Sequence, residues 1–431
     1  MKKINIGLIG LGNVGSGVLK ILNERKALLA EKIGLEINIK KICDIDPSAK
    51  KKIKLNKNLF SRKIKDIIDD PAIDIVVELI GGIHPAKEYI IQALEKGKSI
   101  VTANKALLAQ EGRHLFALAR DRGKSIYFEA SVGAGIPIIK ILREGLIVNK
   151  FSGIFGIVNG TSNYVLSQMS EQNRTFKEAL AQARKKGFAE KDSTLDIEGI
   201  DSAHKLILLT YLASGKFVGM QDIFIEGISH ISLADINYAK EMGLEIKLLA
   251  IAKKEASELE VRVHPTLIPS NHLLSSVSGI FNAIYVSSDL AGNMLFYGPG
   301  AGQLCAASAV VSDLVDLTAD IKAGMFRPTL NISIDKSVKK LRKIDDIESR
   351  YYIRFMAKDQ PGVLARIAGV LAKFGISIAS VTQKERKRAQ FVPIVMIVHD
   401  AKEKNLSEAL RIVDKLNIIS GKSVAIRIEE I

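Results

Sequence analysis

A glycine-rich turn near the start of the chain constrains the fold more than any other feature. The apolar run from Ile4 to Ile9 leads directly into the turn Gly10 to Gly15, and a helical pattern begins at about Ser16. A G-x-G-x-x-G turn between a strand and a helix is the context of the dinucleotide fingerprint, because its glycines let a pyrophosphate approach the helix N-terminus closely. A purely structural turn is the alternative. We therefore predict an α/β domain with a doubly wound parallel sheet of Rossmann type, whose cofactor-binding residues include Gly10, Gly12, Asn13, Val14 and Gly15.

The residue after the second expected strand bears on which dinucleotide binds. That strand, Ile37 to Cys43, ends at Asp44, whose carboxylate can accept from a ribose 2′-hydroxyl and repel a 2′-phosphate, which favours NAD. Lys50, Lys51 and Lys52 follow and are able to neutralise a phosphate, which favours NADP. The sequence leaves NAD and NADP open.

A lysine follows a later strand of the same predicted sheet. The apolar run Ile73 to Leu79 is typical of a buried parallel strand. The next strand, Ser99 to Val101, continues into Thr102-Ala103-Asn104-Lys105. Because open parallel sheets bind their ligands at the carboxyl ends of strands, we expect Lys105 to be a functional residue.

A glycine- and proline-rich loop follows the last strand expected in this domain, Ser125 to Ala130. The loop runs from Ser131 to Pro137, and its carbonyl groups, together with the carboxylate of Glu129, are able to bind a cation. A tight crossing between two domains explains the same composition. The sequence leaves both interpretations open.

From about Lys150 the pattern changes to longer and more amphipathic elements, which indicates a second domain of α+β type. The first expected strand, Phe151 to Val158, leads into Asn159-Gly160-Thr161-Ser162-Asn163, whose small polar side chains are able to line a pocket. A second glycine turn, Gly298 to Gly302, precedes a helix, Ala306 to Thr318, that returns to the first domain and brings Gly302 towards the cofactor. Further strands are expected at Glu260 to His264, Ala283 to Ser287 and Met294 to Tyr297.

The stretch from Gly187 to Lys205 is the most informative for chemistry, because it holds five carboxylates and one well-placed lysine. Asp201 and Lys205 stand one helical turn apart, so both are able to point at one small volume. Glu190, Asp196 and Asp201 offer acceptors for a ligand ammonium group, and Lys205 offers a proton. An exposed acidic loop with an ordinary i,i+4 salt bridge is the alternative.

The C-terminal part follows the order strand, helix, strand, strand, helix, strand, which is the ferredoxin-like arrangement. A segment rich in Lys, Asp and Ser, from Met325 to Ile347, indicates a connector ahead of it. The turn Asp359 to Gly362 precedes the first helix, whose free N–H groups are able to bind a small anion or carboxylate; a plain turn is the alternative. The edges of the four-stranded sheet favour pairing with a second chain. The expected elements are Tyr351 to Ala357, Gly362 to Phe374, Ser377 to Thr382, Gln390 to His399, Glu403 to Leu416 and Val424 to Ile428.

Composition bounds the class of protein. The 431 residues suffice for two or three domains, and two cysteines, Cys43 and Cys305, are too few for a disulfide framework and fit a reducing compartment. Neither a leader-like segment nor a long uncharged apolar run is evident, so we expect a cytoplasmic protein without a membrane span. The lysines behind the net charge of +15 are spread along the chain without a nucleic-acid-binding motif, so we expect no nucleic-acid partner.

With these motifs assembled, nearly the whole chain resembles homoserine dehydrogenases that carry a C-terminal ACT regulatory domain. The most specific motif is G-F-A-E-x-D-x-x-x-D-x-x-G-x-D-x-x-x-K, from Gly187 to Lys205. Four shorter motifs support it: T-A-N-K at Thr102, N-G-T-S-N at Asn159, G-x-G-A-G at Gly298 and D-x-P-G-V-L at Asp359. The resemblance implies NADP- or NAD-dependent reduction of aspartate 4-semialdehyde to homoserine in threonine, methionine and isoleucine biosynthesis. It also implies a homodimer or homotetramer that threonine regulates through the ACT domain.

The resemblance also implies roles for single residues. Lys205 would donate the proton, and Lys105 would contact both the substrate and the nicotinamide. The implied substrate-binding residues are Glu190, Asp196, Asp201 and Thr161. The implied cofactor-binding residues beyond the glycine turn are Asp44, Thr102, Lys105, Gly187 and Gly302. The implied sodium ligands are Glu129, Val132, Ala134 and Ile136, and the implied effector-binding residues are Asp359 and Gly362.

Two departures from the family pattern stand beside these expectations. Ser193 occupies a position where the family usually has proline, and Cys43 occupies one where many members have arginine, which weakens any strict preference for NADP. The expected domains are 1–135 for the nucleotide domain, completed by a helix at 303–322, 136–302 for the substrate-binding and dimerisation domain, 323–348 for the connector, and 349–431 for the ACT domain. Another amino-acid dehydrogenase with the same nucleotide domain and a non-catalytic amino-acid sensor are the alternative functions.

Overall fold

Two compact units make up the computed structural model, which describes residues 3–34, 36–46, 57–325, 337–384 and 390–431. Unit 1 consists of 1–151, 204–220 and 282–336, and unit 2 of 152–203, 221–281 and 337–431. Each unit is therefore assembled from three separate stretches of chain. Lys50, Lys51 and Lys52, which the sequence associates with NADP, lie outside the described residues.

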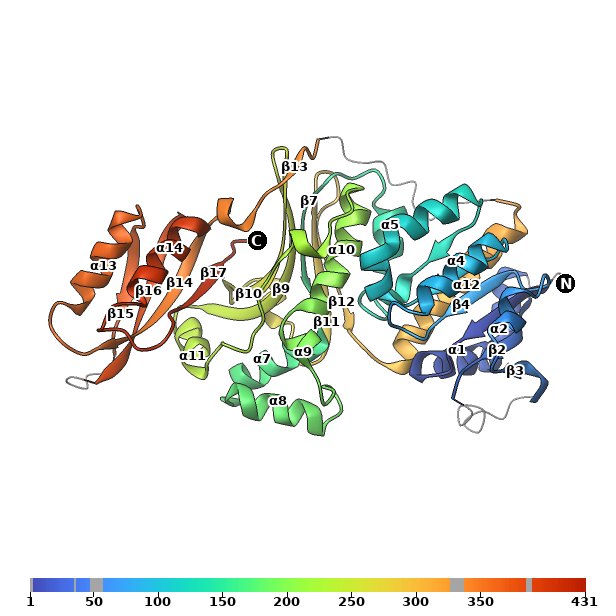
Figure 1. Ribbon diagram of the computed structural model, residues 1–431, viewed down its shortest axis with the longest axis horizontal. Coiled ribbons are helices and arrows are strands. Elements are labelled where there is room, and N and C mark those ends of the chain that lie inside the picture. Colours follow the sequence, from blue (N-terminus) through green and yellow to red (C-terminus); the bar gives the residue numbers. More distant parts are fainter. Residues whose placement is uncertain (1–2, 35, 47–56, 326–336, 385–389) are drawn as a thin grey trace. The chain divides into compact units, whose positions relative to one another are not determined.

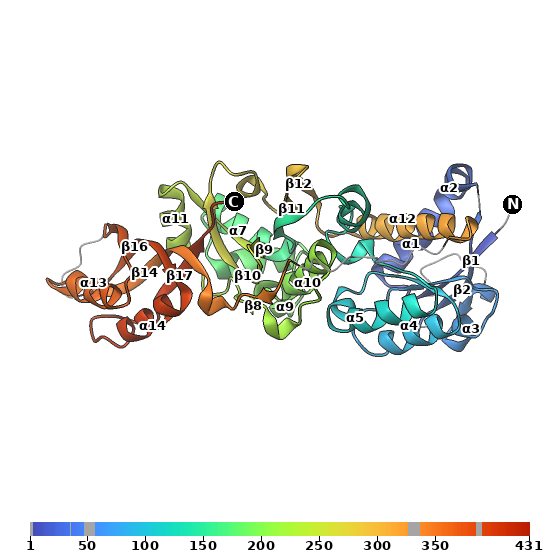
Figure 2. The same ribbon diagram turned by 90° about the horizontal axis from the view of Figure 1, so that it is seen from above.

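Unit 1 contains a six-stranded sheet in the order β3-β2-β1-β4-β5-β6, and its neighbouring strands pair in parallel. The strands are β1 (Lys3–Ile9), β2 (Glu36–Cys43), β3 (Phe60–Ser61), β4 (Ile75–Glu78), β5 (Ser99–Thr102) and β6 (Ile126–Tyr127). One face carries α1 (Asn13–Glu24), α2 (Lys26–Ile33) and α12 (Gln303–Lys322), and the other carries α3 (Lys65–Ile68), α4 (Ala86–Glu95) and α5 (Lys105–Asp121) (Figure 2). This order and two-sided cover confirm the doubly wound fold.

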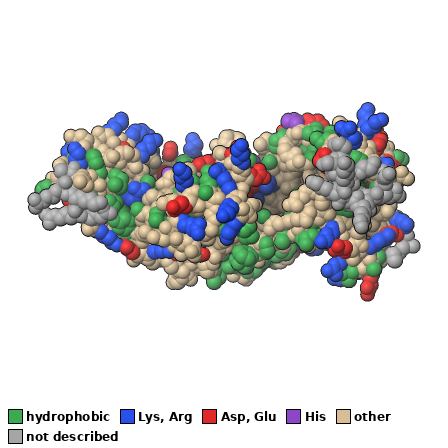
Figure 3. Space-filling model, turned by 90° about the horizontal axis from the view of Figure 1, so that it is seen from below, with side chains coloured by type: hydrophobic (Ala, Val, Ile, Leu, Met, Phe, Trp, Pro, Cys, Tyr) green, Lys and Arg blue, Asp and Glu red, His purple; other side chains and the backbone are tan. Residues whose placement is uncertain are grey.

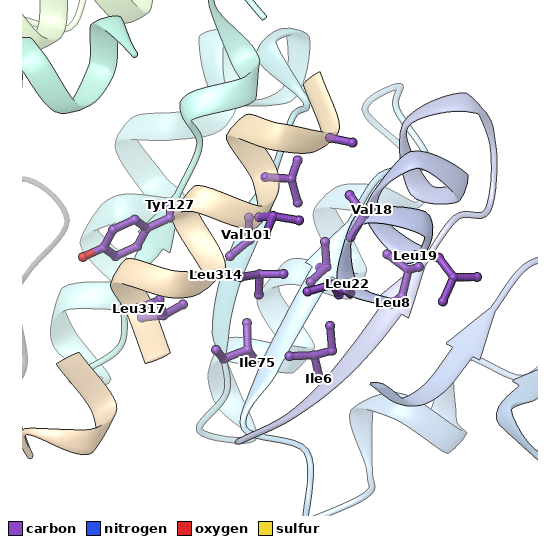
Figure 4. Packing of buried hydrophobic residues seen from close by; sticks show 14 of the residues in the cluster. Ile6, Leu8, Val18, Leu19, Leu22, Ile75, Val101, Tyr127, Leu314 and Leu317 are labelled. Atoms are coloured by element: carbon purple, nitrogen blue, oxygen red, sulfur yellow. The ribbon is translucent and has the colours of Figure 1, made fainter. Parts of the chain in front are cut away.

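An apolar cluster between β1, α1 and α12 forms the centre of unit 1. Ile6 and Leu8 of β1 meet Val18 and Leu22 of α1 and Leu314 of α12, and all five side chains are buried (Figure 4). The two helices approach closely, since a Cβ atom built on Gly17 would lie 2.8 Å from the Cβ atom of Ala307. A helix from far along the chain thus completes the N-terminal fold.

Several element boundaries differ from the sequence expectation. The first helix begins at Asn13 rather than at Ser16, because the last residues of the glycine turn already have helical geometry. The strand expected at Ser125 to Ala130 is only β6, since Glu129–Ser131 turns into a 3₁₀ helix. A long strand, Leu244–Glu255, was not predicted at all, and its apolar run carries no clear alternation.

Unit 2 is built on a mixed sheet in which β7, β9, β10, β17, β14, β16 and β15 are neighbours in that order. Its strands are β7 (Phe151–Ile157), β9 (Leu244–Glu255), β10 (Glu258–Pro269), β14 (Glu348–Lys358), β15 (Ile378–Thr382), β16 (Phe391–Lys402) and β17 (Val424–Ile428), with β8 (Phe224–Ile225) and β13 (Lys340–Leu341) paired to β10. Its helices include α7 (Gly160–Gln172), α8 (Phe176–Lys185), α9 (Thr194–Ile197) and α11 (Leu233–Glu241), while α10 (Ile200–Ser214) begins in unit 2 and ends in unit 1. Unit 1 also holds most of β11 (Phe281–Ser288) and all of β12 (Gly292–Pro299).

The elements from β14 to β17 confirm the predicted ferredoxin-like order. The helices α13 (Val363–Lys373) and α14 (Glu403–Val413) pack on the sheet β17-β14-β16-β15 through one apolar cluster (Figure 1). Strand β17 also pairs in parallel with β10, where Thr266 faces Arg427. The expectation that both sheet edges are free for a second chain is therefore wrong for β17, because β10 of the same chain covers that edge.

Candidate active site

The three glycines of the N-terminal turn have three distinct geometries. Gly10 has a φ of +94°, and a Cβ atom there would lie 2.8 Å from the backbone of Leu79. A Cβ atom on Gly15 would lie 2.1 Å from the carbonyl oxygen of Gly10, whereas one on Gly12 would meet nothing within 4 Å. Gly12 is the N-cap of α1 and makes no side-chain hydrogen bond to the N–H groups at the helix start. The turn thus needs its outer glycines for folding and leaves room for an anion at the middle one.

Asp44 is held against this turn at the end of β2. Its Oδ2 atom accepts a 2.6 Å hydrogen bond from the N–H of Leu11, and its Oδ1 atom accepts one of 2.8 Å from Asp46. The carboxylate is thereby fixed beside the predicted pyrophosphate position. This is where an acidic residue contacts an adenosine ribose in doubly wound dinucleotide domains.

Lys105 stands at the first position of α5, behind two polar residues that order the end of β5. Buried Glu78 accepts a 2.6 Å hydrogen bond from the hydroxyl of Thr102, and that hydroxyl accepts one of 3.0 Å from the N–H of Asn104. The Asn104 side chain caps α5 through the N–H of Leu107. Glu78 and Asn104 were not singled out as site residues, because their roles depend on contacts across neighbouring strands.

Glu129 caps a short helix that follows the loop of the predicted sodium site. Its two carboxylate oxygens accept 2.8 Å hydrogen bonds from the N–H groups of Ile139 and Lys140. Burial raises the pKa of Glu129 to about 7 despite these bonds. The described residues contain no cluster of three or more His, Cys, Asp or Glu side chains suited to a metal ion. Any cation here would therefore depend on backbone carbonyl groups, such as those of Val132, Ala134 and Ile136.

Asn159 joins the two carboxylates that the sequence associates with an ammonium group. Its Nδ2 atom donates to Asp196 Oδ1 at 2.7 Å and to Asp201 Oδ2 at 2.8 Å, while its Oδ1 atom accepts from the N–H of Ser162 and caps α7. Asp201 lies in the first turn of α10, with Lys205 one turn further along that helix. Both Asp201 and Lys205 are buried, so the exposed i,i+4 salt bridge considered above is not their setting.

The remaining residues of this stretch have different surroundings. Glu190 and Gly187 are exposed, and Gly187 has a φ of +75° at the end of α8. The Thr161 hydroxyl donates a 2.7 Å hydrogen bond to the carbonyl oxygen of Phe188, so Thr161 shapes the loop that carries Glu190. Ser193, which departs from the family pattern, is buried and accepts from Arg184.

The second glycine turn lies beside the first one. Gly302 caps α12 without a side-chain hydrogen bond, and the Gln303 side chain donates to the carbonyl oxygen of Asn13 at 3.0 Å. Two uncapped helix N-termini thus lie next to each other in unit 1. Next to the second turn, Asn282 packs on Gly300, and neither polar atom of its buried amide has a hydrogen-bond partner among the described residues.

The turn before α13 carries Asp359 and Gly362, the two residues predicted to bind an effector. Gly362 caps α13 with a φ of +84° and without a side-chain hydrogen bond. Asp359 Oδ1 accepts a long bond of 3.4 Å from Gln383, while its Oδ2 atom is enclosed without a partner among the described residues.

Three general properties of the described residues bear on partners and location: surface charge, helix hydrophobicity and the state of the cysteines. Lys and Arg side chains are scattered among Asp and Glu over the face shown in Figure 3. Every helix in the described part of the chain is too short or too polar to span a bilayer. Cys43 and Cys305 are both free thiols.

A doubly wound sheet with an open glycine turn defines a dinucleotide-binding protein, and comparison with known proteins identifies its family. The family model for homoserine dehydrogenase matches residues 137–315, that for the NAD-binding domain of homoserine dehydrogenase matches 10–129, and that for the ACT domain matches 351–417. Homoserine dehydrogenase of Pseudomonas aeruginosa is 42% identical over the full length of both chains. The chain therefore belongs to the homoserine dehydrogenase family, as an NAD(P)-dependent oxidoreductase with a C-terminal ACT domain.

Solved structures agree with this assignment. The crystal structure of a homoserine dehydrogenase from Thiobacillus denitrificans is 40% identical, with a TM-score of 0.92, and the match covers 100% of this chain and 99% of that one. A hyperthermophilic archaeal homoserine dehydrogenase in complex with NADPH is 27% identical, with a TM-score of 0.64 over 76% of this chain and all of that one. The resemblance seen in the sequence is thus confirmed at the level of family and fold.

Proposed function

We propose that the protein reduces L-aspartate 4-semialdehyde to L-homoserine in a pocket organised by Asn159, Asp196 and Asp201. The observation that carries the proposal is the double hydrogen bond from Asn159, which holds two carboxylates together one helical turn before Lys205. The substrate has one ammonium group, which needs anionic acceptors in a shielded place. Glu190, on the loop that Thr161 fixes, is a further acceptor for that group.

Lys205 acts on charge that develops during the reaction. The bound dinucleotide supplies the hydride to the aldehyde carbon. As the aldehyde oxygen becomes an alkoxide, a cationic Lys205 beside it stabilises the negative charge and donates the proton to that oxygen. Lys105, fixed at the start of α5 by the Asn104 cap, orients the substrate and the nicotinamide.

The cofactor site is proposed to accept both NADPH and NADH. The glycine turn binds the pyrophosphate at the start of α1, and the adjacent start of α12 at Gly302 adds a second set of N–H groups. The fixed carboxylate of Asp44 favours a ribose 2′-hydroxyl, and Cys43 ahead of it is a neutral buried thiol. The NADPH complex of the archaeal relative supports use of NADP within the family.

A sodium ion fits the loop after β6. Glu129 would hold it with the carbonyl groups of Val132, Ala134 and Ile136, a hard-oxygen set that suits such a cation. The hydroxyl of Ser131 is enclosed there without a partner among the described residues, and burial of the Glu129 carboxylate raises its pKa despite the charges of Arg143 and Lys140. The ion would add a further positive charge beside Glu129 and rigidify the loop.

Regulation is proposed to act through the ACT domain. The N–H groups at the start of α13, beside Asp359 and Gly362, would accept the carboxylate of an amino-acid effector, for which threonine is the first candidate. A second chain would pair along β15, the sheet edge opposite the one that β10 covers. A homodimer or homotetramer would follow from such pairing.

The test is turnover of the purified protein with homoserine and NADP or NAD, comparing the wild type with Lys205→Ala. Because Lys205 works on charge present in the transition state, kcat should fall by roughly two to four orders of magnitude while the cofactor Kd stays the same. Lys191→Ala, an exposed lysine of the same stretch, is the control and should behave like the wild type. Near-normal turnover of Lys205→Ala would remove Lys205 from the mechanism.

A further inference from the structure

The ACT domain is joined to the rest of unit 2 by a buried arginine on its edge strand. Arg427 of β17 is 4% exposed and forms two hydrogen bonds with Glu403 at the start of α14, from Nε at 2.8 Å and from Nη2 at 2.7 Å. Its Nη1 atom donates to Glu226 at 2.9 Å, outside the ACT domain, and its guanidinium lies 4.6 Å from the centre of the Phe224 ring. One side chain thus ties the ACT domain to the segment after β8.

The segment after β8 packs directly on the backbone between Asp196 and Asp201, the two carboxylates proposed to bind the substrate. A Cβ atom on Gly227 would lie 2.6 Å from both the carbonyl oxygen of Ile197 and the Cα atom of Glu198, so only glycine fits there. The N–H of Ile228 donates to the same Ile197 carbonyl at 2.8 Å. The residues that follow Glu226 therefore contact the backbone of Ile197 and Glu198 directly.

Ile197 and Glu198 lie between the two carboxylates. Asp196 is next to Ile197 on α9, and Asp201 opens α10 three residues after Glu198. The double hydrogen bond from Asn159 requires both carboxylates to keep their positions. A shift of the backbone between them that moves one carboxylate relative to the other would lengthen these bonds from their present 2.7 and 2.8 Å and weaken the arrangement.

We propose that Arg427 and Glu226 are positioning residues for substrate binding. Arg427, from the ACT domain, holds Glu226, and the segment that contains Glu226 holds residues 196–201 in the geometry that binds the substrate. Neither residue is among the proposed substrate-binding residues. The proposal rests on the proposed role of Asp196 and Asp201 in binding the substrate ammonium group. It gives the ACT domain a direct mechanical connection to the pocket within unit 2.

Steady-state kinetics of Arg427→Lys in the full-length protein test the proposal. Lysine keeps the charge but cannot bond Glu403 and Glu226 together, so the KM for homoserine should rise on the order of tenfold. The values of kcat and of the cofactor KM should stay within about twofold, since the reacting groups are untouched. A merely structural role would not separate KM from kcat in this way.

Arg354→Lys is the matched control. Arg354 of β14 also joins the ACT domain to another part of unit 2, by two hydrogen bonds to buried Asp235. In the described part of the chain, no hydrogen bond links Asp235 to the Ile197–Gly199 backbone. This variant should lower the unfolding temperature as Arg427→Lys does and leave the homoserine KM within about twofold. An equal rise of KM in both variants would overturn the proposal, because general loosening would explain it.

Two further variants keep the result unambiguous. In a Glu226→Gln background, Arg427→Lys should add less than about twofold to KM, because the two residues act in series; full additivity would overturn the proposal.

Asp201→Ala distinguishes failure of the proposed substrate pocket from failure of the proposed positioning role of Arg427. If it leaves the homoserine KM unchanged, the proposed pocket fails. If it raises KM while Arg427→Lys does not, only the positioning role fails.

Discussion

The core of the N-terminal sheet and the junction of the ACT domain are both buried, but the first consists of apolar side chains and the second of charged ones. Between β1, α1 and α12 the contacts are apolar, as with Leu8 and Leu314. At the ACT junction, which we define as Asp235, Arg262, Arg354 and Arg427 with their partners, the buried groups are charged. An apolar core needs its volume filled, whereas a buried ion pair needs one particular partner in one particular place.

The charges at the junction are stabilised chiefly by one another, with added hydrogen bonds to Asp235 from Ser232 and Tyr352. Burial on its own would raise the pKa of Asp235, but hydrogen bonds and charge from Arg354 outweigh it and lower that pKa below its ordinary value. Burial likewise opposes the charge on Arg427, and Glu403 and Glu226 outweigh it, so that the pKa of Arg427 is raised. Such pairs are weak evidence for stability and better evidence for a defined arrangement. The comparison therefore suggests that the apolar core holds the fold, while the junction fixes positions.

The largest expected effect on stability comes from breaking one junction pair. Arg354→Met should lower the unfolding free energy of unit 2 by about 3–5 kcal/mol at pH 7, because it leaves Asp235 buried and unpaired. The deficit should shrink as the pH falls from the ordinary pKa of 3.8 through the lower pKa of folded Asp235, because the wild type loses the stability of its ion pair only in that range, while the unpaired carboxylate of the variant is protonated at a higher pH. Denaturant unfolding at several pH values measures both quantities.

Leu314→Ala is the comparison variant in the apolar core. It should cost about 2–5 kcal/mol through lost burial and a cavity, with a deficit that does not change with pH. Equal pH dependence of the two deficits would erase the contrast between core and junction.

A smaller effect is expected from the neutral histidine at the junction. Burial, together with the charges of Arg427 and Arg262, lowers the pKa of His264 well below 6.5. Its Nε2 atom lies 2.6 Å from Arg262 Nη1 and its Nδ1 atom 2.9 Å from the Pro265 carbonyl oxygen, so the ring accepts at Nε2 and donates at Nδ1. The unfolded chain binds a proton at this residue below pH 6.5 while the folded chain does not, so acid favours unfolding.

His264→Gln isolates that contribution. From pH 6.5 to 5.5 the wild type should lose about 1 kcal/mol more unfolding free energy than His264→Gln, because only the wild type takes up this proton on unfolding. The test compares urea midpoints of the two proteins at both pH values. Parallel pH dependence would mean that His264 titrates normally in the folded protein.

The same contrast explains what the sequence could and could not predict. The glycine turn, the carboxyl-end position of Lys105 and the order of the ACT elements are local patterns, so each was read from contiguous residues. The stretch from Gly187 to Lys205 was recognised for the same reason.

Long-range pairs gave no such signal. Glu226 and Arg427 are 201 positions apart, and nothing near either residue indicates the other. Asn159 reaches carboxylates 37 and 42 positions away, and its motif indicated a pocket without indicating its partners. Coverage of the β17 edge by β10 is likewise a pairing that neither strand's own sequence specifies.

The central claim is that the junction fixes the positions of the Asp196 and Asp201 carboxylates. Hydrogen–deuterium exchange of residues 193–203 tests this claim most directly. Exchange there should be on the order of tenfold faster in Arg427→Lys than in the wild type, because the segment loses its support and opens locally more often. In Arg354→Lys the increase should be confined to α11, where Asp235 lies. Unchanged exchange of 193–203 in Arg427→Lys, or an equal increase there in Arg354→Lys, would contradict the account.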